Sequence, residues 1–383
     1  MPHRDNTNDD SSRTSRRTFL KSSGAAGAAC VAGLSGCIGG FGGGGGKPTI
    51  NMIVWDEYAT PKLVKKLESE FDVKIKTTKS TSSSAMFTAW NSGKDELYDI
   101  AIPNNNYVPK FMKAGLIAPV PMEKITHWEA MYETFKKFAQ TQFSKNGKLY
   151  GVPLRFGWYA YSYDGKEVPD HEQSYDILFD PMYTGKDMTG NIIMYDDHFK
   201  AMSATALYLG YRDAFNGEKV TLTKAQVEKV KQTMIDQKEI IQGYIAADPT
   251  FIKNMKQDNF DVGQSARNEL VAMWDEGIDW PTMATPKEGS LAWFEAGVVS
   301  KKSQHKDLAW DIINAFISPK IGATLAQVGF SPIVNPKTQK YLTEKQNEMY
   351  GAIPPKKLNG MIPFKAVENE KAWIKAWEEI KAA

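Results

Sequence analysis

Large aromatic residues stand beside carboxylates at several places in the sequence, each next to a short apolar run. The first is Trp55-Asp-Glu-Tyr58, which follows the run 49–54. Carboxylates accept charge-assisted hydrogen bonds from ammonium groups, and aromatic faces attract cations, each contact contributing about 0.5–2 kcal/mol when desolvated. The pattern therefore suits an organic cation that also carries methylene groups. Its members are Trp55, Asp56, Glu57, Tyr58, Asn104, Asn105, Asn106, Tyr107, Tyr195, Asp196, Asp197, Trp274, Asp275, Glu276, Trp293, Phe294 and Glu295.

These residues can lie close together only if the apolar runs are strands of an open α/β sheet. In open α/β sheets, ligands bind beyond the carboxyl ends of the strands. We therefore expect the aromatic and acidic residues to line a shared ligand site, although a single Trp or Asp there has an ordinary alternative as a core residue or a helix cap. The expected strands are 49–55, 73–77, 98–102, 191–195, 269–274 and 291–299.

Helical segments alternate with these strands. Thr60-Pro61 offers an N-cap followed by a first-turn proline, Thr223 is a second N-cap, and Gly115 is a glycine of the kind that ends helices. Strands that alternate with helices predict an α/β fold with parallel strands. The expected helices are 61–71, 84–90, 107–115, 224–241, 306–317, one starting at Ser318-Pro319, and 367–381.

The N-terminal segment has the features of an export signal. Arg16 and Arg17 precede an uncharged stretch, 22–36, which has the length of a signal-peptide core and is too short to span a bilayer. Paired arginines in this place resemble a twin-arginine signal, which exports proteins already folded. Leu-Ser-Gly-Cys37 resembles a lipobox. We therefore expect residues 1–36 to be removed, Cys37 to carry lipid, and the glycine-rich residues 37–47 to form a flexible tether.

Charge and cysteine content narrow the function classes. The chain has 47 basic and 45 acidic residues, and residues 1–36 hold five and three of them, which leaves 42 of each in the remainder. This balance argues against a nucleic-acid partner. Cys30, the other cysteine, lies in the signal segment, so the exported part is expected to have no disulfide and no thiolate metal site. It also has no apolar run long enough to be a transmembrane helix.

Enzymatic and metal-binding motifs are scarce. The histidines beyond the signal lack metal-ligand spacing, and neither a phosphate-binding glycine loop nor a nucleophile elbow is present. No cofactor is therefore expected. Paired acids such as Asp56-Glu57 leave one enzymatic alternative open, a surface glycoside hydrolase that uses two carboxylates. The histidines are His127, His171, His198 and His305.

From about residue 50 to the C-terminus, the chain resembles the substrate-binding proteins of polyamine ABC importers, the spermidine/putrescine receptors. The order and spacing of its short motifs carry the resemblance. It implies a two-lobed periplasmic-binding-protein fold of type II, in which each lobe is a mixed sheet flanked by helices. The motifs are Trp55–Tyr58, Tyr98–Pro103 with Tyr107-Val108, Gly151-Val-Pro-Leu with Gly157, Asp196-Asp197, Met273-Trp274, Trp293–Glu295 and Gly329–Pro332.

The resemblance also implies lobe boundaries and crossings. Lobe 1 would comprise 48–156 plus 296–333, and lobe 2 would comprise 157–295 plus 334–383. The chain would cross between them near 156–158, 296 and 332–336. A ligand would lie in the cleft between the lobes and be buried when the hinge closes.

Carried over by position, the resemblance assigns roles to individual residues. Asp197 would hold an ammonium group, while Trp274 and Trp293 would flank the methylene chain. Glu295 would take the role of an aspartate in the family, and Phe330 stands where the family has a tyrosine. The first lobe would contribute Trp55, Asp56, Glu57, Tyr58, Asn106 and Tyr107.

One position departs from the family pattern. Three residues after Asp197, the spermidine receptors have a second amine-binding carboxylate, and this chain has Lys200. A lysine there would repel one amine of a polyamine. A shorter diamine, another organic cation or a ligand with one anionic group would then fit better than spermidine.

The combined prediction is a monomeric, lipid-anchored receptor on the periplasmic or cell-surface side of the membrane. It would capture a small organic cation, of which a polyamine is the first candidate, and deliver it to an ABC permease. It would not be an enzyme. The alternatives are the glycoside hydrolase and a receptor of the same fold for another ligand, such as an anion or an iron complex.

Overall fold

Ten strands of the described residues form one hydrogen-bonded series, in the order β2-β1-β3-β11-β6-β9-β7-β8, with β10 paired to β6 and β12 paired to β11, and β4 and β5 form a separate two-stranded sheet. The computed structural model describes residues 46–383, so the predicted signal, Cys37 and nearly all of the tether lie outside the described residues. The strands are β1 (Thr49–Val54), β2 (Lys74–Lys79), β3 (Ile100–Ala101), β4 (Ser144–Lys145), β5 (Lys148–Leu149), β6 (Val152–Asp164), β7 (Ile192–Tyr195), β8 (Gly243–Ile245), β9 (Val262–Ala266), β10 (Pro281–Met283), β11 (Leu291–Val299) and β12 (Ile362–Pro363).

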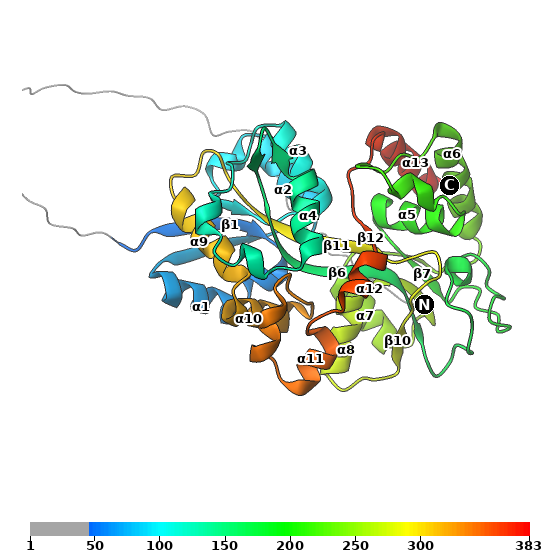
Figure 1. Ribbon diagram of the computed structural model, residues 1–383. Coiled ribbons are helices and arrows are strands. Elements are labelled where there is room, and N and C mark those ends of the chain that lie inside the picture. The colour runs from blue at the N-terminus through cyan, green and yellow to red at the C-terminus, as the bar shows by residue number, and fades with distance from the viewer. Residues whose placement is uncertain (1–45) are drawn as a thin grey trace, which may run out of the picture. The chain divides into compact units, whose positions relative to one another are not determined.

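Strand directions are mixed on both sides of the series. In the first part, β1 runs parallel to β2 and β3, and β11 pairs with β3 in the antiparallel sense. In the second part, β7 runs parallel to β8 and β9, whereas β6 is antiparallel to β9 and β11. The mixed α/β architecture predicted from the sequence is confirmed. Strands β11 and β6 link its two halves (Figure 1).

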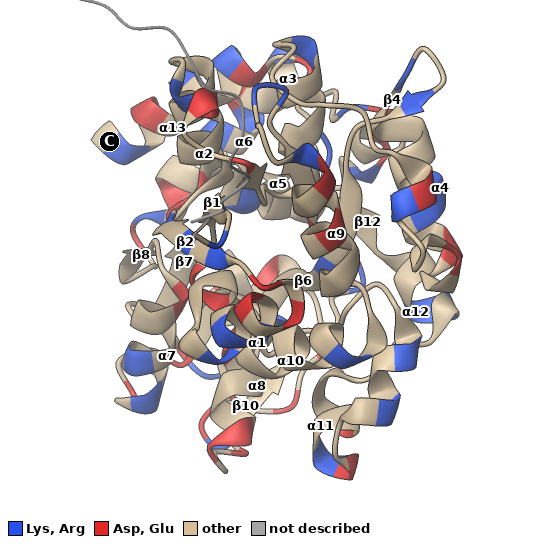
Figure 2. Ribbon diagram, turned by 90° about the vertical axis from the view of Figure 1, so that its left-hand side faces the viewer, with Lys and Arg blue, Asp and Glu red and all other residues tan. Residues whose placement is uncertain are grey.

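Helices cover the sheet on both sides of this junction. In Figure 1, α5, α6 and α13 lie together beside β7, and α1 lies against α10. Basic and acidic residues occur together on helices such as α4 and α11 (Figure 2). The helices are α1 (Pro61–Phe71), α2 (Ser83–Asn91), α3 (Val108–Lys113), α4 (Glu133–Gln142), α5 (His198–Tyr208), α6 (Lys224–Gln237), α7 (Asp248–Lys256), α8 (Arg267–Asp275), α9 (Lys306–Phe316), α10 (Pro319–Gly329), α11 (Glu344–Tyr350), α12 (Pro355–Gly360) and α13 (Glu370–Ala382).

Local sequence signals explain where several helices begin. Pro61 and Pro319 occupy the first turns of α1 and α10, where a missing backbone N–H leaves no intrahelical bond unmade. The Thr223 side chain caps α6 by accepting from the Gln226 backbone N–H, and the Gln226 side chain accepts from the Thr223 backbone N–H. None of the described helices is long and apolar enough to cross a membrane.

One predicted strand is a helix. Residues 269–274 were expected to extend as a strand, and they lie within α8 (Arg267–Asp275). A short apolar run has the same composition in a buried strand and in a buried helix. The strand in this part of the chain is the preceding segment, β9. The Glu269 side chain accepts a hydrogen bond from the Ala266 backbone N–H at 2.8 Å and so stabilises the first turn of α8.

Three segments of chain lie side by side where the crossings were predicted. Strand β6 pairs with β11, and the 331–336 segment lies along β6. The backbone N–H of Phe156 donates to the Pro332 carbonyl at 3.0 Å, and that of Val334 donates to the Leu154 carbonyl at 2.9 Å. These three segments therefore position side chains at the junction between the two halves.

Buried apolar residues form one large cluster in each half and a smaller third cluster under α7 and α8. Val334, Met349, Tyr350 and Leu358 belong to the first cluster. We propose that the first lobe also takes in residues 334–358, because these side chains share its core. The second lobe would then regain the chain near β12.

Candidate ligand-binding site

Arg155 forms the centre of a buried polar cluster at the junction. It lies near the start of β6, and its side chain is 3% exposed. Its Nε donates to Glu295 Oε2 at 3.0 Å and its Nη2 donates to Glu295 Oε1 at 2.6 Å. The same Nη2 donates to Glu57 at 3.0 Å, and Nη1 donates to the Gly329 carbonyl at 2.7 Å. Such a two-point contact fixes the orientation of both groups.

Burial and neighbouring charges shift the pKa values of the groups in this cluster. Burial raises the pKa of Glu57, and Arg155 opposes that rise. Burial also works against the charge on Arg155, but Glu295 and Glu57 raise the pKa of the guanidinium well above its usual range. The Tyr58 hydroxyl donates to Glu295 Oε2 at 2.6 Å, and burial followed by the Glu295 charge raises the pKa of Tyr58. Arg155 is therefore the common partner of both carboxyl groups, Glu57 and Glu295.

The indole of Trp293 lies against this cluster. The guanidinium carbon of Arg155 is 5.2 Å from the centre of the Trp293 ring. Gly157 pairs with Trp293 across β6 and β11, and a β-carbon at Gly157 would stand 2.6 Å from the ring atom Cζ2. Only glycine leaves room for the indole there. The indole N–H groups of Trp293 and Trp55 are buried and have no hydrogen-bond partner among residues 46–383.

A second polar cluster surrounds the end of β7. The Tyr195 hydroxyl lies 2.7 Å from Glu269 and also contacts Asp248. Burial, and then the charge of Asp248, raises the pKa of Glu269 well above its usual range. Since a phenol has one proton, the Tyr195 hydroxyl can donate to only one of these two carboxyl groups at a time. Asn268 supports this arrangement by donating to Asp248 at 2.8 Å.

Lys200 lies between the rings of this cluster. Its ammonium nitrogen is 4.2 Å from the centre of the Tyr195 ring and 4.5 Å from that of Tyr159. Over the residues from 46 to 383 it makes neither a hydrogen bond nor an ion pair within 4 Å. Tyr159 stacks on Phe364 at 5.9 Å. Burial and the charges of Asp248, Glu269 and Asp197 all raise the pKa of Tyr159, which places these acids around its ring.

Asp197 and Tyr107 approach one another from the two halves. The Asp197 carboxylate caps α5 by accepting from the Lys200 backbone N–H at 2.9 Å, which occupies one of its oxygens. Burial raises the pKa of Tyr107 to about 12, with Glu370 and Asp197 as further contributors. Next to it, the side-chain oxygen of Asn106 is buried without a partner in the described part of the chain. Aromatic rings, carboxylates and an ammonium group therefore gather around the start of α5.

Comparisons with known proteins show the family of the chain. Residues 62–355 match the family model described as bacterial extracellular solute-binding protein. The chain belongs to this family. Residues 13–33 match the twin-arginine translocation signal sequence, which confirms the predicted export signal and is consistent with a protein of the periplasm or cell surface.

Relatives of this solute-binding protein include named polyamine receptors. The chain is 22% identical over 296 residues to the spermidine/putrescine-binding periplasmic protein of Escherichia coli, covering 77% of this chain and 80% of that protein. It is 20% identical over 343 residues to a putrescine-binding periplasmic protein of Pseudomonas aeruginosa, with 86% and 90% covered.

Solved structures show the same fold. A putative spermidine/putrescine ABC transporter protein of Listeria monocytogenes matches with a TM-score of 0.72 at 21% identity, covering 87% of this chain and 98% of that one. A lipoprotein of Treponema pallidum matches with a TM-score of 0.72 at 19% identity, with 87% and 99% covered. The two-lobed binding-protein fold predicted from the sequence is therefore confirmed.

The structure brings part of the predicted site together. Glu57, Tyr58, Trp293 and Glu295 contact Arg155 or lie beside it. Phe330 directly follows the Gly329 carbonyl that Arg155 binds, and it ends α10 in a left-handed conformation with φ of 49°. These five residues therefore surround one guanidinium that the sequence analysis did not single out.

Asp56 and Trp274 lie differently. Asp56 is exposed and forms an ion pair with Lys79 at 3.3 Å. Trp274 lies in the last turn of α8, where its indole N–H donates to the Pro281 carbonyl at 3.0 Å. The guanidinium carbon of Arg267 is 5.4 Å from the Trp274 ring and 5.1 Å from the Trp158 ring, and burial lowers the pKa of Arg267 to about 10. No contact in the described range joins Trp274 to Trp293.

Sequence reasoning missed several residues of the two clusters. Arg155 and Asp248 carry no local motif, because one lies inside a hinge strand and the other starts α7 after a short strand. Glu269 was placed in a strand. A usable signal existed for the strand that carries Arg155, since the alternating aromatics Tyr159, Tyr161 and Tyr163 are typical of a strand.

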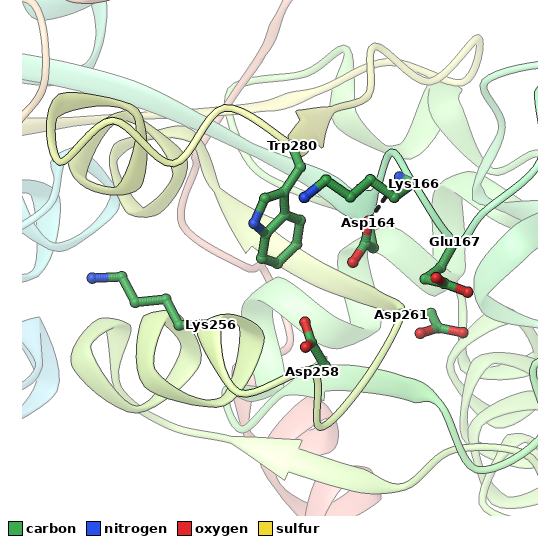
Figure 3. Close-up of a pocket in the computed structure, with 7 residues that line it drawn as sticks. All are labelled: Asp164, Lys166, Glu167, Lys256, Asp258, Asp261 and Trp280. Carbon is green, nitrogen blue, oxygen red and sulfur yellow. Dashed lines mark hydrogen bonds between the residues drawn. The ribbon is translucent and has the colours of Figure 1, made fainter.

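A separate hollow lies near the start of β9, away from these clusters. It has a volume of about 390 Å³ (Figure 3). Lys186 bridges two of its acids, Glu167 at 3.3 Å and Asp261 at 3.1 Å. Among the described residues there is no group of His, Cys, Asp or Glu side chains arranged to hold a metal ion. Its lining residues are Asp164, Lys166, Glu167, Lys256, Asp258, Asp261 and Trp280.

Proposed function

We propose that this protein is the lipid-anchored receptor of an ABC importer and that it binds a small organic amine between its lobes. The supporting observation is the meeting of carboxylates and aromatic rings from both halves. Burial is the main cause of the raised pKa of Tyr107 and of Tyr159, and the charge of Asp197 contributes to both. Its relatives named as spermidine- or putrescine-binding proteins support the amine class. Cys37 would attach the receptor to the membrane, and the permease would be its partner.

The hydrolase alternative receives no support from the geometry. Two carboxyl groups of a glycosidase must remain free to act as acid and base. Here Glu57 and Glu295 both bind Arg155, and Glu295 also accepts from Tyr58. Non-catalytic binding is therefore the better proposal, and a monomer suffices for it.

Calorimetric titration of the exported part, residues 37–383 with Cys37→Ser, tests the amine assignment. We expect at least one of putrescine, cadaverine, agmatine, spermidine and their parent amino acids to bind with a dissociation constant in the micromolar range. Asp197→Asn should weaken that binding about tenfold or more, since it removes a charge and retains a cap. Asp56→Asn is the matched control, because Asp56 is exposed beside Lys79. Absence of binding below about 1 mM for every compound would rule out the proposal.

A further inference from the structure

We propose that the ligand of this receptor carries an anionic group as well as an amine, and that Lys200 binds the anionic group. The inference rests on the proposed function, since it concerns the same site. It changes the ligand class from a polyamine, which is a pure cation, to an amino acid or a similar zwitterion. Three features of the described residues carry it.

The first feature is the engagement of the carboxylates near β11. A polyamine needs a separate acid for each ammonium group. Glu295 offers none, because Arg155 binds both of its oxygens and Tyr58 binds one of them again. Glu57 shares the same guanidinium at 3.0 Å. A second ligand ammonium would have to displace a buried arginine from its partners, so Arg155 acts as a built-in substitute for that ammonium.

The second feature is the ammonium group of Lys200. It has no acid partner within residues 46–383, yet two rings hold it at 4.2 and 4.5 Å. Cation–ring contacts at this range orient the group without neutralising its charge. The buried Glu269 on α8 does not pair with it, because Tyr195 and the Ala266 backbone N–H already bind the two oxygens of Glu269. Lys200 therefore presents an unpaired ammonium group that repels a ligand ammonium and attracts a carboxylate.

The third feature is the type of polar atom left without a partner. The indole N–H groups of Trp55 and Trp293 are buried donors, and an indole nitrogen cannot accept. Trp293 lies beside Arg155, and Trp55 directly precedes the 3-10 helix Asp56–Ala59 that carries Glu57 and Tyr58. Protonated amines supply donors only, whereas a carboxylate supplies acceptors. The two indole donors thus suit a carboxylate, whereas the unpaired side-chain oxygen of Asn106 is an acceptor and suits an ammonium group, so together these atoms fit a ligand that carries both.

Asp197, which would bind the amine of such a ligand, is close to Lys200 in the sequence. Asp197 begins the same helix turn, and one of its oxygens caps α5 through the Lys200 backbone N–H. Its other oxygen has no protein donor in the described range. An ammonium group at Asp197 and a carboxylate at Lys200 would balance both charges.

Pairs of compounds that differ by one carboxylate test this inference directly. Ornithine and putrescine, lysine and cadaverine, and arginine and agmatine are such pairs, to be titrated by calorimetry. We expect the tightest binder to be an amino acid, bound at least tenfold more tightly than its decarboxylated partner. Lys200→Glu should reverse that preference, lowering the affinity for the amino acid and raising that for the amine. The ratio of the two affinities should shift by a hundredfold or more.

Control variants separate the local effect from general ones. Lys219→Glu makes the same change of charge at an exposed position and should leave the ratio unchanged. Lys200→Arg keeps the positive charge and should keep the amino-acid preference. Thermal unfolding of each variant verifies that it folds.

The outcomes distinguish this inference from the proposed function. If a diamine or agmatine binds the wild type more tightly than its amino acid, the zwitterion inference is wrong and the amine receptor stands. The inference is equally wrong if Lys200→Glu leaves the affinity ratio unchanged. If no compound of either kind binds below about 1 mM, the receptor proposal itself fails.

Discussion

Arg155 lies between two carboxylates that the sequence offers as amine ligands. Buried ion pairs of this kind stabilise little relative to an apolar core, because desolvation offsets their attraction. Removing one member is costly, however, since it leaves an unpaired charge behind. The residue therefore fixes the positions of Glu57, Glu295 and Tyr58 relative to each other.

Arg155→Met should lower the free energy of unfolding by about 3–5 kcal/mol, because Glu295 then remains buried without its counter-ion. Urea denaturation measures the change. Lys287→Met removes a pair with Glu172 in which the side chains are 50% and 66% exposed, and such a pair contributes at most about 1 kcal/mol. Equal effects of the two variants would contradict the assigned role of Arg155.

Glu269 makes a prediction about pH. Its pKa in the folded protein is raised, by burial first and then by Asp248, above the ordinary value of 4.5. The folded protein thus keeps a proton that the unfolded chain loses, so the stability from this group is complete below about pH 4.5 and declines as the pH rises. Glu269→Gln has no such proton to lose.

The free energy of unfolding of the wild type should therefore fall relative to that of Glu269→Gln between about pH 5 and pH 8. Denaturation at several pH values measures this difference. Glu218→Gln, at an exposed position, should run parallel to the wild type. A difference that grew in favour of the wild type with rising pH would show that Glu269 is charged in the folded state.

At the scale of elements, the start of α5 combines a structural and a binding role. The Asp197 side chain satisfies a backbone N–H of the first turn, which is worth about 1 kcal/mol. Asparagine caps nearly as well as aspartate, whereas alanine does not. The two roles can therefore be separated by substitution.

Asp197→Ala should lower the free energy of unfolding by about 1 kcal/mol, and Asp197→Asn by only a few tenths. Both should weaken ligand binding, because both remove the charge. Thr223→Ala, which removes the cap of α6, is the matched control and should change stability alone. Normal ligand affinity in Asp197→Asn would show that Asp197 serves the helix and not the ligand.

Several elements were predictable because their signals are local. Caps and first-turn prolines fixed the starts of α1, α6 and α10, and short apolar runs identified β1, β7 and β11. The long hinge strand β6 was not predicted. Helix α8 was not predictable as a helix, since its apolar run has no cap residue of its own and Glu269 does that work from the third position. The site was predictable only in part. The aromatic and acidic residues were found, but their partners Arg155 and Asp248 are set by pairing between segments far apart in the sequence.

At the scale of the whole molecule, export precedes function. The match to a twin-arginine signal at residues 13–33 implies that the receptor leaves the cell folded. The double substitution Arg16→Lys and Arg17→Lys should abolish export, so that immunoblots of cell fractions find the protein in the cytoplasm. Substitution of the nearby Arg13→Lys is the control and should leave export intact. Normal export of the double variant would indicate another route.

The position of β11 in the sheet sets the order in which the chain becomes complete at the ribosome. Strand β3 pairs with β1 early, but its other neighbour is formed by Val298 and Val299, which pair with Ala101 and Ile100. The edge of β3 therefore stays open until most of the polypeptide has been translated. A nascent chain of this kind has to be shielded from aggregation during synthesis, and its fold can close only near the end of translation. A transport route that accepts finished proteins suits a chain whose first strands wait for its last third.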